Sequence, residues 1–337
     1  MRQAVRDQEH ARASSRRILP ALGLFLLAPL VGEFLLGNLP ITMLGALLLL
    51  APLYGGGALL IRETARRWRL GWPGIGALCL AYGLVEEAFV TQSLFNPNFA
   101  GLRLLDYGYI PGLGISAWWT VFVLSIHAVW STAVPIALVE SLAPDARATP
   151  WLGPLGLAVA ALLFAASCVL LFLVQQQEPF MASAPQLIGS AVIVALLSAG
   201  AIALWGRDPR PRASTTGAPA HRVVVGTTFL LGSAFMALAI IHDAIPAAAN
   251  VAGMLALLAA GCALLWRWSA RAGWSQRHVF AAAAGLILVY VWYSFVQVPS
   301  IPGATPLIDA IGNAIFACGA LGLLVLGWRR LGADLMR

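Results

Sequence analysis

Two adjacent carboxylates, Glu86 and Glu87, lie within an apolar stretch that is long enough to form a membrane-spanning helix. An ionisable side chain at the centre of such a helix costs about 2.5–3.5 kcal/mol to insert, so a pair predicts a functional site. His127 follows forty residues later in a second apolar stretch, eight residues before Pro135. A carboxylate beside a neutral imidazole can take a proton from water, and it can also bind protons or cations.

Neighbouring residues of an α-helix point about 100° apart, so we expect one of the two glutamates to face the site and the other to pack. Glu87 shares a helical stripe with Gly83 and Thr91 and is the narrower candidate. Pro135 cannot donate a hydrogen bond to the Ser131 carbonyl, which predicts a kink one turn beyond His127. Other polar residues of the spans form a secondary set of candidates: Glu33, Thr91, Ser131, His242, Asp243, Asp309 and Asn313.

The elements that must position these residues are membrane helices. Of the 337 residues, 60% are hydrophobic and only 10% are charged, which exceeds what a soluble core can bury. A transmembrane helix needs about 20 apolar residues. Runs of that kind predict an all-α polytopic bundle of about ten spans, near residues 18–38, 41–62, 72–95, 115–141, 151–174, 184–205, 223–243, 246–266, 278–298 and 307–328.

Arginine placement predicts the orientation of these spans. All 21 basic residues are arginines, and all but Arg103 fall at alternate ends of the runs. Because basic residues favour the cytoplasmic side, both termini are predicted to be cytoplasmic in a bacterial-type cell membrane. The clusters lie between apolar runs, so topology explains them and nucleic-acid binding is not expected. The lipid bilayer is the one predicted partner, and the sequence identifies no protein partner.

Composition divides the chain into four parts. Residues 1–17 form a basic cytoplasmic tail, and residues 18–205 form a six-span bundle. Residues 206–222, rich in Pro, Ser, Thr and Arg, predict a cytoplasmic linker. Residues 223–337 form a four-span bundle with a short tail. The loop at 96–114 is too apolar for a free loop and is interpreted as a lid or re-entrant piece over the site.

The motif Gly83-Leu-Val-Glu86-Glu87, followed by His127, resembles the CPBP intramembrane proteases, the CAAX-protease and bacteriocin-processing family. That family carries Glu-Glu-x-x-x-Arg on one helix and Phe-x-x-x-His on a later one. Here Thr91 stands at the arginine position and Val123 at the phenylalanine position. The resemblance implies a membrane-embedded hydrolase in which glutamate and histidine activate water, or an inactive relative of such an enzyme.

Two other functions fit the same residues. The carboxylates would serve a secondary transporter or channel as proton or cation sites, or they would only hold together a non-catalytic membrane subunit. Metal binding is the less favoured chemistry, because Glu86, Glu87 and His127 lack the spacing of a His-Glu-x-x-His motif. The four cysteines also lack metal-ligand spacing, so no metal and no other cofactor is predicted.

Overall fold

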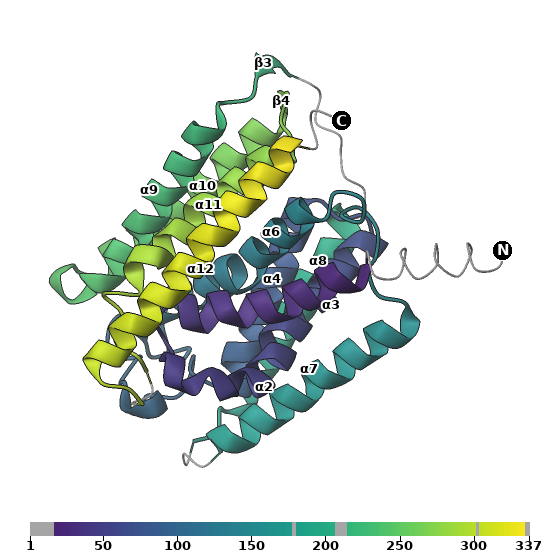
Figure 1. The fold of residues 1–337 in the computed structure, drawn as a ribbon. Coiled ribbons are helices and arrows are strands. Elements are labelled where there is room, and N and C mark those ends of the chain that lie inside the picture. The colour runs from purple at the N-terminus through teal and green to yellow at the C-terminus, as the bar shows by residue number, and fades with distance from the viewer. Residues whose placement is uncertain (1–16, 177–179, 206–213, 301–302, 334–337) are drawn as a thin grey trace.

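The computed structural model describes residues 17–176, 180–205, 214–300 and 303–333. The predicted all-α bundle is confirmed, since long helices account for nearly all regular structure in these ranges (Figure 1). Residues 1–16 of the predicted tail (1–17) and residues 206–213 of the predicted linker (206–222) lie outside the described residues. Within the linker range, Ser214–Gly217 is not coil but a short strand, β3, paired in parallel with β4 (Arg271–Ala272).

Nine helices among the described residues are long and apolar enough to cross a membrane. Their bounds are Arg17–Leu35, Ile41–Arg67, Trp72–Val90, Ala117–Leu142, Pro154–Gln175, Ala184–Leu204, His221–Ile240, Ala247–Ser269 and Pro306–Gly332. The one predicted span that is not among these nine, 278–298, corresponds to the helix α11 (Gln276–Tyr293). This helix begins with Gln, Arg and His, which lowers its mean hydropathy, and eleven of its 18 residues are buried.

The helices form two groups that meet along one interface. The first group comprises α2 (Leu47–Leu50), α3 (Gly56–Arg67), α4 (Trp72–Val85), α5 (Ala117–Ile126), α6 (Val134–Leu142), α7 (Pro154–Gln175) and α8 (Ala184–Trp205). The second comprises α9 (His221–Ile240), α10 (Ala247–Ser269), α11 and α12 (Pro306–Ala333). Helix α11 packs on α9 and α12 within its own group and on α6 of the first, so it joins the two (Figure 1).

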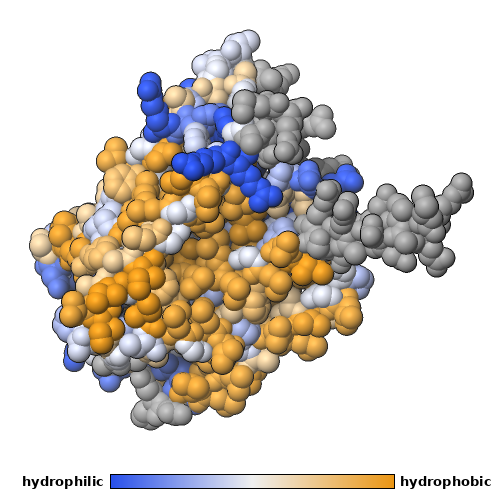
Figure 2. Space-filling view, in the orientation of Figure 1, coloured by the Kyte–Doolittle hydropathy of each residue, from blue (hydrophilic) through white to orange (hydrophobic). Residues whose placement is uncertain are grey.

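Apolar side chains cover most of the molecular surface that Figure 2 shows. Hydrophilic residues gather at the end of the bundle that carries β3 and β4, above a broad apolar region. In the most apolar window of α7, of α8 and of α10, only 11% of the residues are buried inside the protein. An apolar surface of this extent fits a bilayer as solvent and would aggregate in water.

The loop after the glutamate pair is structured. It contains a short 3₁₀ turn at Phe99–Gly101 and a two-stranded hairpin of β1 (Tyr109–Ile110) with β2 (Ile115–Ser116). The Ser116 hydroxyl donates to the Tyr107 carbonyl, and the Tyr107 hydroxyl donates to the Ile245 carbonyl, 2.6 Å in each case. The loop is therefore anchored to the connection between α9 and α10.

Candidate functional site

The candidate site is built by four π-helical segments. Among the described residues these segments are η1 (Leu30–Leu35), η3 (Ala51–Gly55), η4 (Glu86–Val90) and η6 (His127–Ala133). Each contributes to one polar centre: Glu33 from η1, Tyr54 from η3, both glutamates from η4 and His127 from η6. Single π turns inside α-helices occur frequently at functional sites, so four in one place mark this centre.

Proline explains where three of these segments form. Pro29 precedes η1, Pro52 lies in η3, and Pro135 follows η6 by two residues. A proline removes one backbone donor from the helical ladder, and the turn before it must find other partners. In η6 the Thr132 hydroxyl donates to the carbonyls of His127 and Ala128, each at 2.9 Å. The kink expected near Pro135 takes the form of this π-helical segment.

The imidazole of His127 lies between the two carboxylates. Its Nε2 is 2.8 Å from Glu87 Oε1, and its Nδ1 is 3.2 Å from Glu86 Oε2. All three residues are buried, with 3–6% of each exposed. Gly83 permits this approach of the two helices, because a Cβ there would lie 3.1 Å from the Cβ of His127.

The expectation that only one glutamate reaches the site is wrong. A π turn has more residues than an α turn, so successive side chains diverge by less than 100°. The imidazole also has two nitrogens on different edges, and each glutamate meets one of them. Both carboxylates therefore contact the same ring although they are neighbours in sequence.

The two glutamates differ in their remaining contacts. The second oxygen of Glu87 accepts hydrogen bonds from the hydroxyls of Ser93 and Thr91, the latter at 3.0 Å. The Trp119 indole donates to Ser93 at 3.0 Å and fixes its position. By contrast, Oε2 of Glu86, the oxygen that lies 3.2 Å from His127 Nδ1, is buried and makes no hydrogen bond to a described residue. Glu87 is therefore fixed through both of its oxygens, whereas Glu86 Oε2 has only its imidazole contact and can accept a hydrogen bond from a further donor.

A third carboxylate, Glu33, extends the centre. It accepts hydrogen bonds from the Tyr54 hydroxyl and from Asn38 Nδ2, the latter at 2.6 Å. The ring of Tyr54 lies 5.8 Å, centroid to centroid, from that of His127. Ser131 Oγ is 3.5 Å from His127 Nδ1, at the limit of a hydrogen bond. Three secondary candidates, Glu33, Thr91 and Ser131, thus belong to the centre.

The other four secondary candidates are placed elsewhere. His242 stacks on Trp118 at 4.3 Å between centroids, and Asp243 beside it is largely exposed. Asn313, on α12, donates to the Ser294 carbonyl at 2.8 Å. Asp309 lies one turn before it on the same helix. Among the described residues, no hydrogen bond or ion pair links these four to His127 or the glutamates.

Ligand atoms of Glu86, Glu87 and His127 all lie within 4.8 Å of one another, which is compact enough for a metal ion. Each imidazole nitrogen, however, already contacts a carboxylate oxygen. A metal ion would have to displace one of these contacts. The arrangement as it stands favours proton exchange between the imidazole and either carboxylate.

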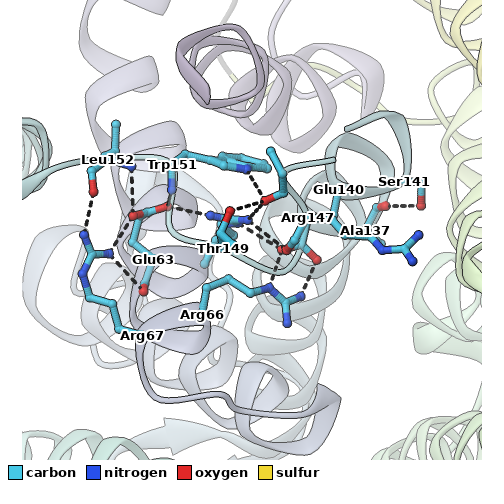
Figure 3. Close-up of polar contacts among 12 residues, drawn as sticks. Glu63, Arg66, Arg67, Ala137, Glu140, Ser141, Arg147, Thr149, Trp151 and Leu152 are labelled. Atoms are coloured by element: carbon cyan, nitrogen blue, oxygen red, sulfur yellow. Dashed lines mark hydrogen bonds and ion pairs between the residues drawn. The ribbon is translucent and has the colours of Figure 1, made fainter. Parts of the chain in front are cut away.

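A separate buried ion network holds together the C-terminal ends of α3 and α6 (Figure 3). Glu140 Oε1 accepts from Nε of Arg62 at 3.0 Å and from Nε of Arg66 at 2.6 Å. Glu63 pairs with Arg62 at 2.7 Å and with Arg67 at 2.6 Å. Arg62, Glu63 and Glu140 are almost completely buried. Helices α3 and α6 follow η3 and η6, so this network holds the helices that carry Tyr54 and His127.

The same network reaches the start of α7. The backbone amides of Trp151 and Leu152 donate to the Glu63 carboxylate at 2.8 and 3.1 Å. The Arg62 guanidinium lies 3.6 Å from the centre of the Trp151 ring, a cation–π contact. The sequence shows a basic cluster here but gives no sign that Glu140, over seventy residues away, completes it.

A model of an uncharacterized membrane protein family matches residues 22–333 of the chain. The protein belongs to this family. The match covers all nine candidate spans except a few terminal residues, so the whole bundle is the unit that the family shares. The matching model is not that of the CPBP proteases, and the resemblance to them remains limited to the short motifs. No curated protein and no solved structure matches the chain.

Proposed function

We propose that the protein is a membrane-embedded hydrolase in which Glu86 and His127 activate a water molecule. One observation supports the proposal: His127 lies between two carboxylates, and Glu86 Oε2, 3.2 Å from the imidazole, is buried without a hydrogen bond to a described residue. A water molecule bound to that oxygen would lie within reach of the imidazole. Glu87, fixed by Ser93 and Thr91, keeps the imidazole in place.

In the proposed reaction, Glu86 takes a proton from water while the water oxygen bonds to the carbonyl carbon of an ester or amide. The bond from that carbon to the leaving oxygen or nitrogen then breaks. The proton passes through His127 to the leaving group, so the site returns to its starting state. A positioned general base of this kind contributes about 10²–10⁴-fold to the rate.

The test uses the full chain in proteoliposomes with fluorogenic ester and peptide substrates. We expect Glu86→Gln and His127→Ala each to lower hydrolysis at least 100-fold, the lower part of the range for general-base catalysis. Glu87→Gln should lower it less, because the residue positions the imidazole. Asp309→Asn, on α12, is the matched control and should not change the rate. Equal rates in wild type and Glu86→Gln would refute the proposal.

A second candidate function is proton or cation transport, which the third carboxylate favours. Glu33, Glu86 and Glu87 with a protonated His127 would leave two net negative charges in a medium of low dielectric constant, so the centre must hold protons or a cation. Flux measured in the same proteoliposomes under a pH gradient separates the two functions. Hydrolysis without flux supports the enzyme, and flux that Glu33→Gln abolishes supports the transporter. If the protein shows neither hydrolysis nor flux, the result supports a non-catalytic subunit.

The location in a bacterial-type cell membrane with both termini cytoplasmic is part of the proposal. It is supported by the arginine distribution, which places 20 of the 21 arginines on one side and only Arg103 on the other. Glu86–Val90 then ends its span at the outer face, with the loop that contains β1 and β2 above it. Reporter fusions after residue 68 and after residue 106 should show opposite orientations.

A further inference from the structure

A groove of about 190 Å³ lies between α3, α4, α7 and α8. Its walls are almost entirely apolar and include Leu60, Leu78, Val85, Phe164 and Val194. Only 11% of the residues in the most apolar windows of α7 and α8 are buried, and both helices expose apolar side chains on the outside of the bundle, where the bilayer would lie. The groove therefore opens sideways, between helices that face lipid.

Tyr82 separates this groove from the polar centre. The residue lines the groove, and its ring centroid is 6.4 Å from that of His127 on the other side. Gly57 makes room for it, because a Cβ at this position would lie 2.2 Å from Tyr82 Cε2. The Tyr82 hydroxyl is buried and has no hydrogen-bond partner among the described residues.

The Tyr82 hydroxyl, a donor, and Glu86 Oε2, an acceptor that contacts His127, are both buried without a hydrogen bond to a described residue, and Tyr82 lies between the groove and His127. A buried hydroxyl without a hydrogen bond is destabilising, so its presence calls for a partner that arrives from outside. A carbonyl group accepts one hydrogen bond at its oxygen and is attacked at its carbon. The Tyr82 hydroxyl would donate a hydrogen bond to the carbonyl oxygen, and Glu86 Oε2 would take the proton from the water that attacks the carbonyl carbon.

The lining of the groove determines which kind of chain can be attached to the carbonyl. An extended peptide brings one backbone donor and one backbone acceptor per residue, and each is strongly destabilising if it is left unpaired in an apolar environment. Of the side chains that line the groove, only Thr64, Ser198 and Tyr82 carry a polar group. A hydrocarbon chain needs no partners and arrives from the bilayer, so the groove favours an acyl chain.

We propose that the groove binds one acyl chain of a membrane lipid, and that Tyr82 donates a hydrogen bond to the ester carbonyl at the end of that chain. The ester then lies beside Glu86. Water adds to the carbonyl carbon, Glu86 takes its proton, and the oxyanion is stabilised by Tyr82. The ester C–O bond breaks, the proton reaches the departing alkoxide through His127, and a fatty acid and a lysolipid are released. The reaction rests on the proposed function, but chain binding does not.

Chain binding is tested with the full protein in vesicles that contain a phospholipid with a diazirine on one acyl chain. After photolysis, mass spectrometry should place the label on α4 and α8 along the groove. Ala81→Trp fills the groove and should lower this labelling at least fivefold. Ile193→Trp, on the outward side of α8 with the residue 50% exposed, is the matched control and should leave it unchanged. If Ala81→Trp does not fold, Leu78→Phe serves the same purpose.

Even labelling of the outer sides of α7 and α8, unaffected by either groove-filling variant, would overturn the proposal. The role of Tyr82 has its own readout. Tyr82→Phe keeps the ring, so labelling should persist, while kcat for lipid ester hydrolysis falls about 10²-fold with KM unchanged. Ala81→Trp should instead raise KM. If the wild-type protein is labelled along the groove but hydrolyses no ester, the acyl-chain site is supported and the hydrolase is rejected. If it hydrolyses esters but is not labelled along the groove, the hydrolase is supported and the acyl-chain site is rejected.

Discussion

The variant Glu140→Gln tests how far the buried ion network stabilises the fold. Arg62 is fully buried, and Glu140 is one of the two carboxylates that neutralise it. Removing one partner of a buried ion pair costs about 3–5 kcal/mol, because the other charge stays buried without compensation. Glutamine keeps one acceptor oxygen, and Arg66 is partly exposed, so we expect the lower end, about 3 kcal/mol. At about 2–4 °C per kcal/mol, the unfolding midpoint should fall by about 6 °C or more.

The assay is thermal unfolding in detergent, followed by the fluorescence of the 12 tryptophans. The control is Asp106→Asn, which breaks a pair with Arg103 whose side chains are 75% and 54% exposed. Water screens that pair, so its loss should leave the midpoint almost unchanged. The double variant Glu140→Gln with Arg66→Gln should lose less than the sum of the two singles. A midpoint for Glu140→Gln equal to that of the control would refute the reasoning.

Three further predictions concern the centre. Thr91→Val removes a donor to Glu87 and should lower hydrolysis severalfold, whereas Thr91→Ser should retain it; equal rates would mean that this contact does not position Glu87. Gly57→Ala should displace the Tyr82 ring and lower both the unfolding midpoint and acyl-chain labelling, while Gly76→Ala, with nothing within 4 Å, should change neither. Glu33→Gln keeps the hydrogen bond from Tyr54 but removes a charge. If the protein is a hydrolase, this variant should hydrolyse substrate severalfold faster than Glu86→Gln does. A loss of hydrolysis as large as that of Glu86→Gln would mean that Glu33 takes part in the reaction.

The helices and the main polar residues could be predicted from hydropathy and from the free-energy cost of inserting ionisable groups into a membrane. Apolar runs of about 20 residues reproduce the bundle because helices satisfy the backbone hydrogen bonds that lipid cannot. The insertion cost of ionisable groups selected Glu86, Glu87 and His127, which the structure brings together. The side chains around them were missed: Tyr54 donates to Glu33, Ser93 donates to Glu87, and the Tyr82 ring lies beside His127. These are ordinary residues whose roles come only from tertiary contacts.

The π segments mark the limit of sequence reasoning here. Arguments about helical faces assume 3.6 residues per turn, and that period misplaces side chains wherever a turn has an additional residue. Pro29, Pro52 and Pro135 are the visible signal for three of the segments. For the segment that holds the glutamates there is no such proline, and we find no sequence pattern that would have predicted it.

Deletion of Ala133 tests whether the π segment is what directs His127 to the glutamates. Ala133 ends η6, and α6 beyond it is anchored by the ion network through Glu140. Removing one residue can convert the π turn to an α turn, which keeps the helix continuous but rotates His127 by about 100° relative to α6. The variant should therefore fold and lose hydrolysis, or flux if the transporter is correct. Deletion of Ala283, buried in the regular helix α11, has no π turn to absorb it and should lower the unfolding midpoint much further. Equal destabilisation by the two deletions, or full activity without Ala133, would show that the π turn does not set the position of His127.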